Sequence, residues 1–223
     1  MSQLPLITQV PFADEQYMHD VYPKKQIYLH HTAGNANPIG VFKYWGKTGE
    51  RVATCVTVGG LPGTSKDWKD GDIAQGFSSK YWAYHLGLQT TTFTKFKIPY
   101  QSLDKISIGV EICNWGYLVK TDRGFTTYVN TTVPDDQVVE YKDKFKGQKY
   151  YHKYTDAQIE STRKLLLYWK DIYGIPLTYN EDIWDICPRA LKGEAGVYTH
   201  NSVRKDKSDI HPQPEMIAML KSL

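Results

Sequence analysis

The stretch KISIGVEICN at residues 105–114 decides the fold, because apolar side chains alternate along it with small or polar ones. A period of two residues predicts a β-strand. The apolar face comprises Ile106, Ile108, Val110 and Ile112. The opposite face carries Glu111, whose carboxylate is costly to bury unless it is paired or functional. Glu111 therefore belongs either to an edge strand with one solvated face or to a functional site.

Three further stretches predict strands, and they are QIYLHH at 26–31, RVATCVTV at 51–58 and residues 73–76. Asn37 and Pro38 predict the start of a helix that ends near Gly46. Strands thus come early, with a helix after the first one and a long helix late. This order predicts a mixed α/β fold, in which a central mixed β-sheet is flanked by helices.

The late helix is predicted from its caps. Thr155 and Gln158 form a capping-box pattern, and Gly174 followed by Pro176 ends the helix. Its predicted buried side comprises Ile159, Leu165, Leu166, Trp169 and Ile172. A last short helix is expected at about 213–222.

Length and composition predict one globular domain over residues 1–223. Hydrophobic residues make up 41% of the chain, which excludes a disordered protein. Residues 117–152 show the least regular pattern, and we expect them to form a surface insertion of loops or a hairpin. No apolar run is long enough to span a bilayer, so no integral membrane association is expected.

The net charge is +3, and basic residues are interleaved with acidic ones, which argues against a nucleic-acid partner. The N-terminal stretch MSQLPLITQVPFADEQ lacks the pattern of a secretory signal. We therefore expect a protein made in the cytoplasm. Its three cysteines, Cys55, Cys113 and Cys187, have no close partner in sequence and are expected to be reduced thiols.

Two histidine-containing stretches suggest a metal site. His30 and His31 end a predicted strand, while the polar stretch YTHNSVRKDKSDIHP at 198–212 supplies His200, Lys207 and Asp209. One histidine of the first strand, with His200 and Asp209, would give the three protein ligands typical of catalytic zinc. The alternative is that 198–212 is a solvated charged loop.

At this point the sequence resembles a known family, the type 2 zinc N-acetylmuramoyl-L-alanine amidases, which include phage lysozyme-like amidases and peptidoglycan recognition proteins. The matching stretches are IYLHHTAG at 27–34, DGDIAQ at 70–75, WAYHLG at 82–87, ISIGVEICN at 106–114, YTDAQIESTRKLL at 154–166 and THNSVRKDKSDIHP at 199–212. The resemblance implies the family's fold. It also implies hydrolysis of the amide bond between N-acetylmuramic acid and L-alanine in peptidoglycan.

The resemblance implies roles for five residues. His30, His200 and Asp209 would hold one zinc ion per chain, Glu111 would be the catalytic general base, and Lys207 would stabilise the oxyanion. One branch of the family has instead a catalytic tyrosine on the second strand, where this chain has Thr54. No tyrosine role therefore carries over.

Alternative ligands remain for two of the three positions. His31 could replace His30, and His211 could replace Asp209. Cys187 would suit zinc chemically, but the resemblance gives it no role.

Four residues are expected to contact the substrate, and they are His31, Thr32, Trp82 and His85. The substrate partner would be peptidoglycan, bound by a monomer. A bacteriolytic phage endolysin released at host lysis is the favoured setting, and a cytoplasmic cell-wall recycling amidase is the alternative. The rival of a different class is a peptidoglycan-binding module without catalysis.

Overall fold

The computed structural model describes residues 6–223 and is built around a mixed six-stranded sheet. Its strands are β1 (Ile7–Gln9), β2 (Gln26–His31), β3 (Val56–Val58), β4 (Ile73–Gln75), β5 (Ser107–Ile112) and β11 (Gly196–Thr199). They lie in the order β1-β4-β3-β5-β2-β11, and the β3–β4 pair is antiparallel whereas the others are parallel. The predicted mixed sheet flanked by helices is confirmed.

Two predicted strands are shorter in the structure. The strand expected at 51–58 forms only at β3, because the backbone of residues 51–53 bonds with Tyr84 instead of the sheet, and Arg51 adopts a left-handed φ of 55°. The strand expected from residue 105 begins at Ser107, because Leu103–Ile106 forms the short helix α3. β5 is central and buried on both faces, so Glu111 does not lie on an edge strand.

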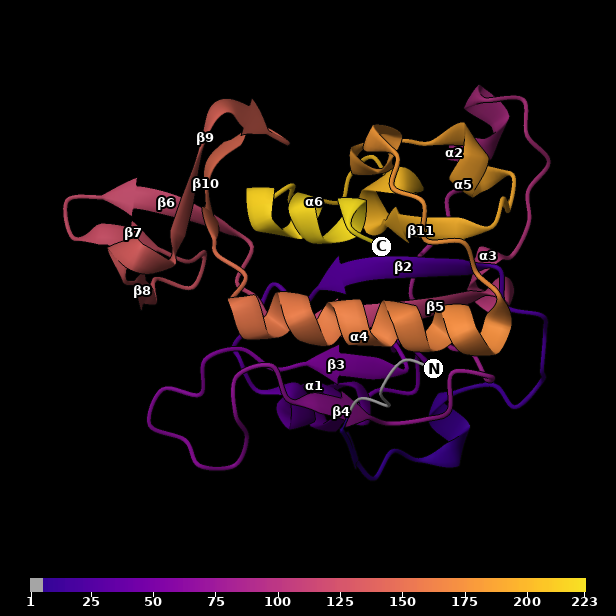
Figure 1. Cartoon of the computed structure of the whole chain (residues 1–223), viewed down its shortest axis with the longest axis horizontal. Helices are drawn as coiled ribbons and strands as arrows, with labels where there is room; N and C mark the ends of the chain where they lie inside the picture. The colour runs from indigo at the N-terminus through magenta and orange to yellow at the C-terminus, as the bar shows by residue number, and fades with distance from the viewer. Residues whose placement is uncertain (1–5) are drawn as a thin grey trace.

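Helices α1 (Pro38–Trp45) and α4 (Asp156–Tyr173) begin and end where their caps predict. The Asn37 side chain accepts hydrogen bonds from the first turn of α1, and Gly46 is its C-cap. Thr155 and Gln158 form a complete capping box, and Gly174 ends α4 with a φ of 67°. Figure 1 shows α4 lying along the sheet.

The prediction that Ile172 is buried is wrong, since its side chain is 49% exposed. At 3.6 residues per turn, Ile172 lies about 80° away from Thr162, which is near the centre of the buried stripe. Tyr173 continues that stripe instead, and its hydroxyl group lies 2.9 Å from Ser79 Oγ.

Residues 117–152 are more ordered than the expected loops or hairpin. They form an antiparallel sheet of five strands in the order β8-β7-β6-β10-β9. Its strands are β6 (Tyr117–Thr121), β7 (Gly124–Thr126), β8 (Thr132–Val133), β9 (Val138–Phe145) and β10 (Gln148–His152). This second sheet projects from one end of the central sheet (Figure 1). We refer to it as the insertion sheet.

The remaining elements are short. The other α-helices are α2 (Thr90–Lys95), α5 (Pro188–Leu191) and α6 (Pro214–Lys221), so the last predicted helix is confirmed. The 3-10 helices are η1 (Asp14–Gln16), η2 (Asp135–Gln137), η3 (Glu181–Trp184) and η4 (His200–Ser202). No helix within residues 6–223 has both the length and the apolar composition needed to cross a membrane. All three cysteines are buried and free, as expected.

Strand register decides which histidine shares a face with Glu111. His30 of β2 pairs with Glu111 of β5, and His31 pairs with Ile112. Paired residues point to the same side of a sheet, and successive residues point to opposite sides. His30 and Glu111 therefore face one side, and His31 faces the other, toward Tyr154 at the start of α4.

Candidate metal centre

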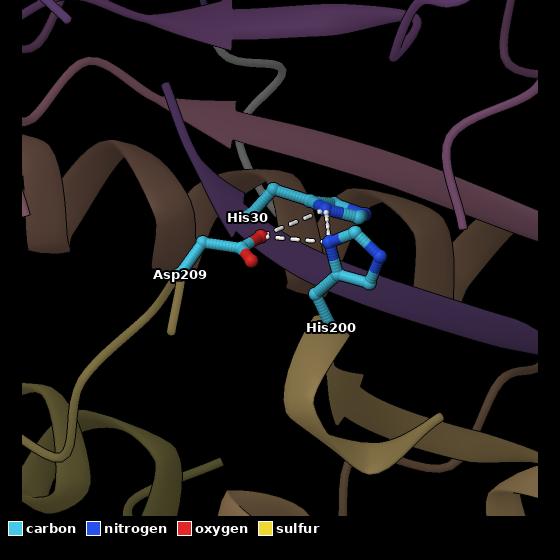
Figure 2. A group of neighbouring side chains, drawn as sticks. All are labelled: His30, His200 and Asp209. Atoms are coloured by element: carbon cyan, nitrogen blue, oxygen red, sulfur yellow. Dashed lines mark hydrogen bonds and ion pairs between the residues drawn. The ribbon is translucent and has the colours of Figure 1, made fainter. Parts of the chain in front are cut away.

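Three side chains predicted as zinc ligands converge at the carboxyl ends of two neighbouring parallel strands. His30 lies near the end of β2, His200 directly follows β11, and Asp209 comes from the loop before α6. Figure 2 shows their polar atoms pointing at one another. The two Nδ1 atoms are 3.1 Å apart, and Asp209 Oδ2 lies 3.2 Å from His30 Nδ1 and 2.9 Å from His200 Nδ1.

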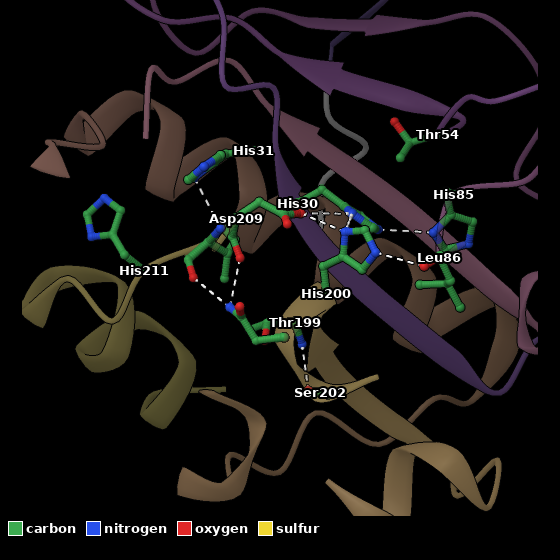
Figure 3. Close-up of polar contacts among 12 residues, drawn as sticks. His30, His31, Thr54, His85, Leu86, Thr199, His200, Ser202, Asp209 and His211 are labelled. Atoms are coloured by element: carbon green, nitrogen blue, oxygen red, sulfur yellow. Dashed lines mark hydrogen bonds and ion pairs between the residues drawn. The ribbon is translucent and has the colours of Figure 1, made fainter. Parts of the chain in front are cut away.

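The far nitrogens of both histidines are held by further groups. His200 Nε2 lies 2.9 Å from the carbonyl oxygen of Leu86, which can only accept, so Nε2 carries the proton. His30 Nε2 lies 3.0 Å from His85 Nδ1, and His85 Nε2 lies 2.9 Å from Ser107 Oγ (Figure 3). We assign the His30 proton to Nε2, donated to His85. Both Nδ1 atoms then present lone pairs to the centre, as metal-bound histidines do.

This donor set fits zinc. With both Nδ1 lone pairs and the Asp209 carboxylate facing one another, the three atoms repel unless a cation or an extra proton lies between them. Zinc bonds of about 2.0–2.2 Å in a tetrahedron would place the ligand atoms about 3.3–3.6 Å from one another, a few tenths of an ångström longer than the 2.9–3.2 Å seen here. Within residues 6–223, this is the one cluster in which three such donor atoms lie within 4.8 Å of each other.

The protonation states also suit a metal. Burial, helped by the neighbouring His200, lowers the pKa of His30 to about 4, so this imidazole is neutral at pH 7. Burial alone would raise the pKa of Asp209, but His200 and His30 outweigh it and hold that pKa well below its usual value. A neutral imidazole and an ionised carboxylate are the forms that bind a metal.

The cluster lies in a cleft of about 730 Å³, whose lining also includes Glu111 and Lys207. The Glu111 side chain is only 9% exposed. Burial, and then the negative charge of Asp209, raise the pKa of Glu111 well above its usual value, while the positive charge of Lys207 acts to lower it. A carboxyl group with a raised pKa, beside a cation and a metal-binding cluster, is suited to proton transfer.

The loop that carries Lys207 is anchored to the segment that follows His85. Arg204 donates to the carbonyl oxygen of Gly87 and pairs with Asp206 at 2.6 Å. The structure thus brings together all five residues to which the resemblance gave metal or catalytic roles.

Of the four residues expected to contact substrate, three line the cleft and one does not. Thr32 and His85 line the cleft, and His85 also accepts the hydrogen bond from His30 Nε2. His31 borders the cleft, but its Nδ1 accepts from the backbone N–H of Ile210 at 3.1 Å and lies 2.9 Å from the Tyr154 hydroxyl. Trp82 does not line the cleft; it is buried, with its ring edge-on to Tyr84.

The alternative ligands lie outside the cluster. Both ring nitrogens of His211 are engaged elsewhere, with Tyr141 and with the carbonyl oxygen of His152. The thiol of Cys187 lies 3.2 Å from Asp182 Oδ2. Thr54 lines the cleft, and its hydroxyl group donates to the carbonyl oxygen of Val56.

Sequence reasoning missed two aromatic residues of the cleft. Tyr44 of α1 lines it and is largely exposed. Tyr128 comes from the insertion sheet, in the β7–β8 connection, and donates to the carbonyl oxygen of Ala33 at 2.8 Å. The helical pattern of 38–45 could have indicated an outward Tyr44. No local signal could place Tyr128, because its contact with Ala33 spans 95 residues.

Comparison with known proteins gives a family match. A family model described as N-acetylmuramoyl-L-alanine amidase matches residues 20–214. A search of curated proteins finds no significant match.

Several solved structures share the fold. The PlyG catalytic domain matches with a TM-score of 0.55 at 15% identity, covering 98% of this chain and 94% of that one. The Staphylococcus aureus hydrolase AmiA, solved with its ligand, gives 0.53 at 13% identity, covering 98% and 83%. A mutant endolysin from Bacillus subtilis gives 0.52 at 14% identity, covering 97% of each chain. At such identities the likeness shows the fold alone.

Proposed function

The chain belongs to the N-acetylmuramoyl-L-alanine amidase family, and from that premise we propose that it is a zinc-dependent hydrolase that uses His30, His200 and Asp209 as ligands. The amidases of this family act on the bond between N-acetylmuramic acid and L-alanine in peptidoglycan. The observation that carries the zinc proposal is the convergence of three lone-pair donors, 2.9–3.2 Å apart, at the base of the cleft.

Zinc, when bound, would act as a Lewis acid that polarises the scissile carbonyl and lowers the pKa of a coordinated water. The chain's own groups would carry the proton. Glu111 accepts a proton from the attacking water as the new C–O bond forms. Its raised pKa favours holding that proton until the C–N bond breaks. Glu111 then gives the proton to the leaving amine of L-alanine.

Lys207 would stabilise the negative charge that develops on the carbonyl oxygen. It lines the same cleft as Glu111, on the loop that Arg204 anchors. A cation that stabilises charge present only in the transition state raises kcat and leaves substrate binding in the ground state unchanged.

Two variants with a matched control test the zinc proposal. His200→Ala removes one ligand, and His19→Ala removes an exposed histidine outside the cleft. After dialysis against a limited zinc supply, we expect one zinc per chain in the wild type and in His19→Ala, with hydrolysis of a soluble muropeptide by both. His200→Ala should lose both properties. Stoichiometric zinc and full hydrolysis in His200→Ala would contradict the proposal.

For the biological setting we propose lysis of a bacterial host. One of the proteins with the same fold is an endolysin, and the 117–152 insertion, which adds Tyr128 to the cleft lining, is larger than a minimal recycling enzyme would need. A lysin should hydrolyse intact, crosslinked peptidoglycan at least as well as soluble fragments. Activity confined to soluble fragments would instead indicate cell-wall recycling.

A further inference from the structure

The segment that follows Asp209 is held in a strained conformation. Ile210 is fully buried and has a φ of +56°, in the left-handed region that β-branched residues rarely adopt. Such a conformation costs about 1–2 kcal/mol and persists only where surrounding contacts enforce it. The segment lies between η4 and α6 and has no regular secondary structure of its own.

Side chains of η4 and β2 hold this segment on one side. The Asn201 side-chain amide donates to the carbonyl oxygens of Asp209 and Ile210, at 2.8 Å and 3.0 Å. The backbone N–H of Ile210 donates to His31 Nδ1. Figure 3 shows Asp209 between His31 and His200.

The insertion sheet holds the segment through His211, which is fully buried. The ring donates from Nε2 to the carbonyl oxygen of His152 on β10 at 3.0 Å, because a carbonyl oxygen can only accept. Its Nδ1 is then the acceptor for the Tyr141 hydroxyl of β9, at 2.7 Å. The ring also stacks on Tyr154, with centroids 4.5 Å apart and planes inclined by 20°.

We propose that Tyr141 is a positioning residue for the metal centre, which acts through His211 to fix the backbone that carries Asp209. Two strands of the insertion sheet hydrogen-bond to His211, two positions after Asp209. If one of these bonds is lost, Ile210 can relax toward an ordinary φ, and the Asp209 carboxylate can turn away from His30 and His200. The insertion sheet would thus support the metal ligands in addition to contributing Tyr128 to the cleft lining. This inference rests on the proposed zinc site.

The test compares two variants that each lose one hydrogen bond of the insertion sheet. Tyr141→Phe removes the bond to His211. Tyr151→Phe removes a bond of 2.9 Å to the carbonyl oxygen of Phe145, within the same sheet, and keeps the ring that packs against His211. Zinc Kd is measured by competition with a chromophoric chelator, and the thermal midpoint of the metal-free protein is measured in parallel. The visible spectrum of bound Co²⁺ reports the ligand geometry.

We expect Tyr141→Phe to raise the zinc Kd about tenfold, the lower end of what supporting residues around metal ligands contribute, and to alter the Co²⁺ spectrum. Both variants should lower the thermal midpoint of the metal-free protein by similar amounts, because each loses one hydrogen bond. Tyr151→Phe should nevertheless leave the zinc Kd unchanged. An unchanged Kd in Tyr141→Phe, or an equal loss of affinity in both variants, would overturn the proposal. Failure of the wild type to bind zinc would instead overturn the proposed function.

A second comparison shows whether the effect passes through Asp209. In an Asp209→Ala background, Tyr141→Phe should not weaken the residual zinc binding any further, because the ligand that it positions is gone. A tenfold loss that persists in that background would mean that Tyr141 acts by another route, and would also overturn the proposal.

Discussion

Replacing Glu111 by Gln is expected to make the metal-free protein more stable and the enzyme nearly inactive. The substitution keeps the shape of the side chain and removes its charge. Glu111 is 9% exposed, and burial together with Asp209 raises its pKa well above the usual value. At neutral pH the folded protein therefore carries a penalty for the carboxylate that the unfolded chain, which solvates it, does not.

The sign and size of the effect follow from proton linkage. A raised carboxyl pKa means that the folded state binds the proton more tightly than the unfolded state, whose glutamate pKa is about 4.3. Stability then falls as the pH rises from the unfolded pKa to the folded pKa, by about 1.4 kcal/mol for each pH unit between them. Because the carboxyl group lines an open cleft, we expect Gln to recover about 1–2 kcal/mol at pH 7.

Thermal denaturation in the presence of a chelator measures this gain. For a chain of this size, 1 kcal/mol corresponds to about 2–4 °C, so a gain of about 1–2 kcal/mol should raise the midpoint by about 2–8 °C at pH 7. The rise should vanish at pH 4, where the carboxyl group is largely protonated in both states. Glu50→Gln, at an exposed loop position, is the matched control and should change the midpoint at neither pH.

The same variant should lose activity by about 10²–10⁴-fold in kcat, the usual contribution of a general base. Stability and activity thus move in opposite directions, which loss of structure cannot imitate. A lower midpoint for Glu111→Gln at pH 7, or a kcat close to that of the wild type, would refute the reasoning.

Three further predictions test other parts of the site. Zinc at about 100 times its Kd should stabilise the protein by about 2.7 kcal/mol in thermal denaturation, and an unchanged midpoint on adding zinc would count against the ligand set. Lys207→Ala should lower kcat by about 10²–10³-fold with little change in KM in steady-state kinetics, whereas a change confined to KM would assign Lys207 to substrate binding. Gly109→Ala would place a Cβ 2.6 Å from Thr54 Cγ2 and 3.1 Å from His85 Nδ1. We expect it to lower the free energy of unfolding in urea by about 1–3 kcal/mol and, by displacing His85, to weaken zinc binding. Unchanged zinc affinity would argue against support of His30 by His85.

Much of the central sheet and its helices could be predicted because their signals are local. Alternation in 107–112 indicates β5, and the Asn37 and Thr155 caps start α1 and α4 where the sequence places them. The strand at 51–58 was overestimated, because its apolar residues partly pair with Tyr84 rather than the sheet. Propensity does not report which partner a backbone finds.

In the site, too, residues with a sequence signal could be predicted and long-range contacts could not. Side-chain spacing and the family resemblance together indicated His30, His200, Asp209, Glu111 and Lys207, which the structure gathers in one cleft. The contact of His85 with His30 and that of Tyr141 with His211 could not be predicted, because they join residues 55 and 70 positions apart, respectively. Such contacts depend on strand order and on the insertion sheet, and neither has a signature in local sequence.

Mass spectrometry of purified peptidoglycan digested with and without a zinc chelator tests the central claim most directly. We expect the protein to release free stem peptides with an N-terminal L-alanine and to form no new reducing sugar ends. The chelator should stop the release until zinc is restored. Digestion that proceeds equally with the chelator would contradict the proposed zinc dependence. Retention of the polymer without any release would indicate a binding module and contradict the catalytic roles proposed for Glu111 and Lys207.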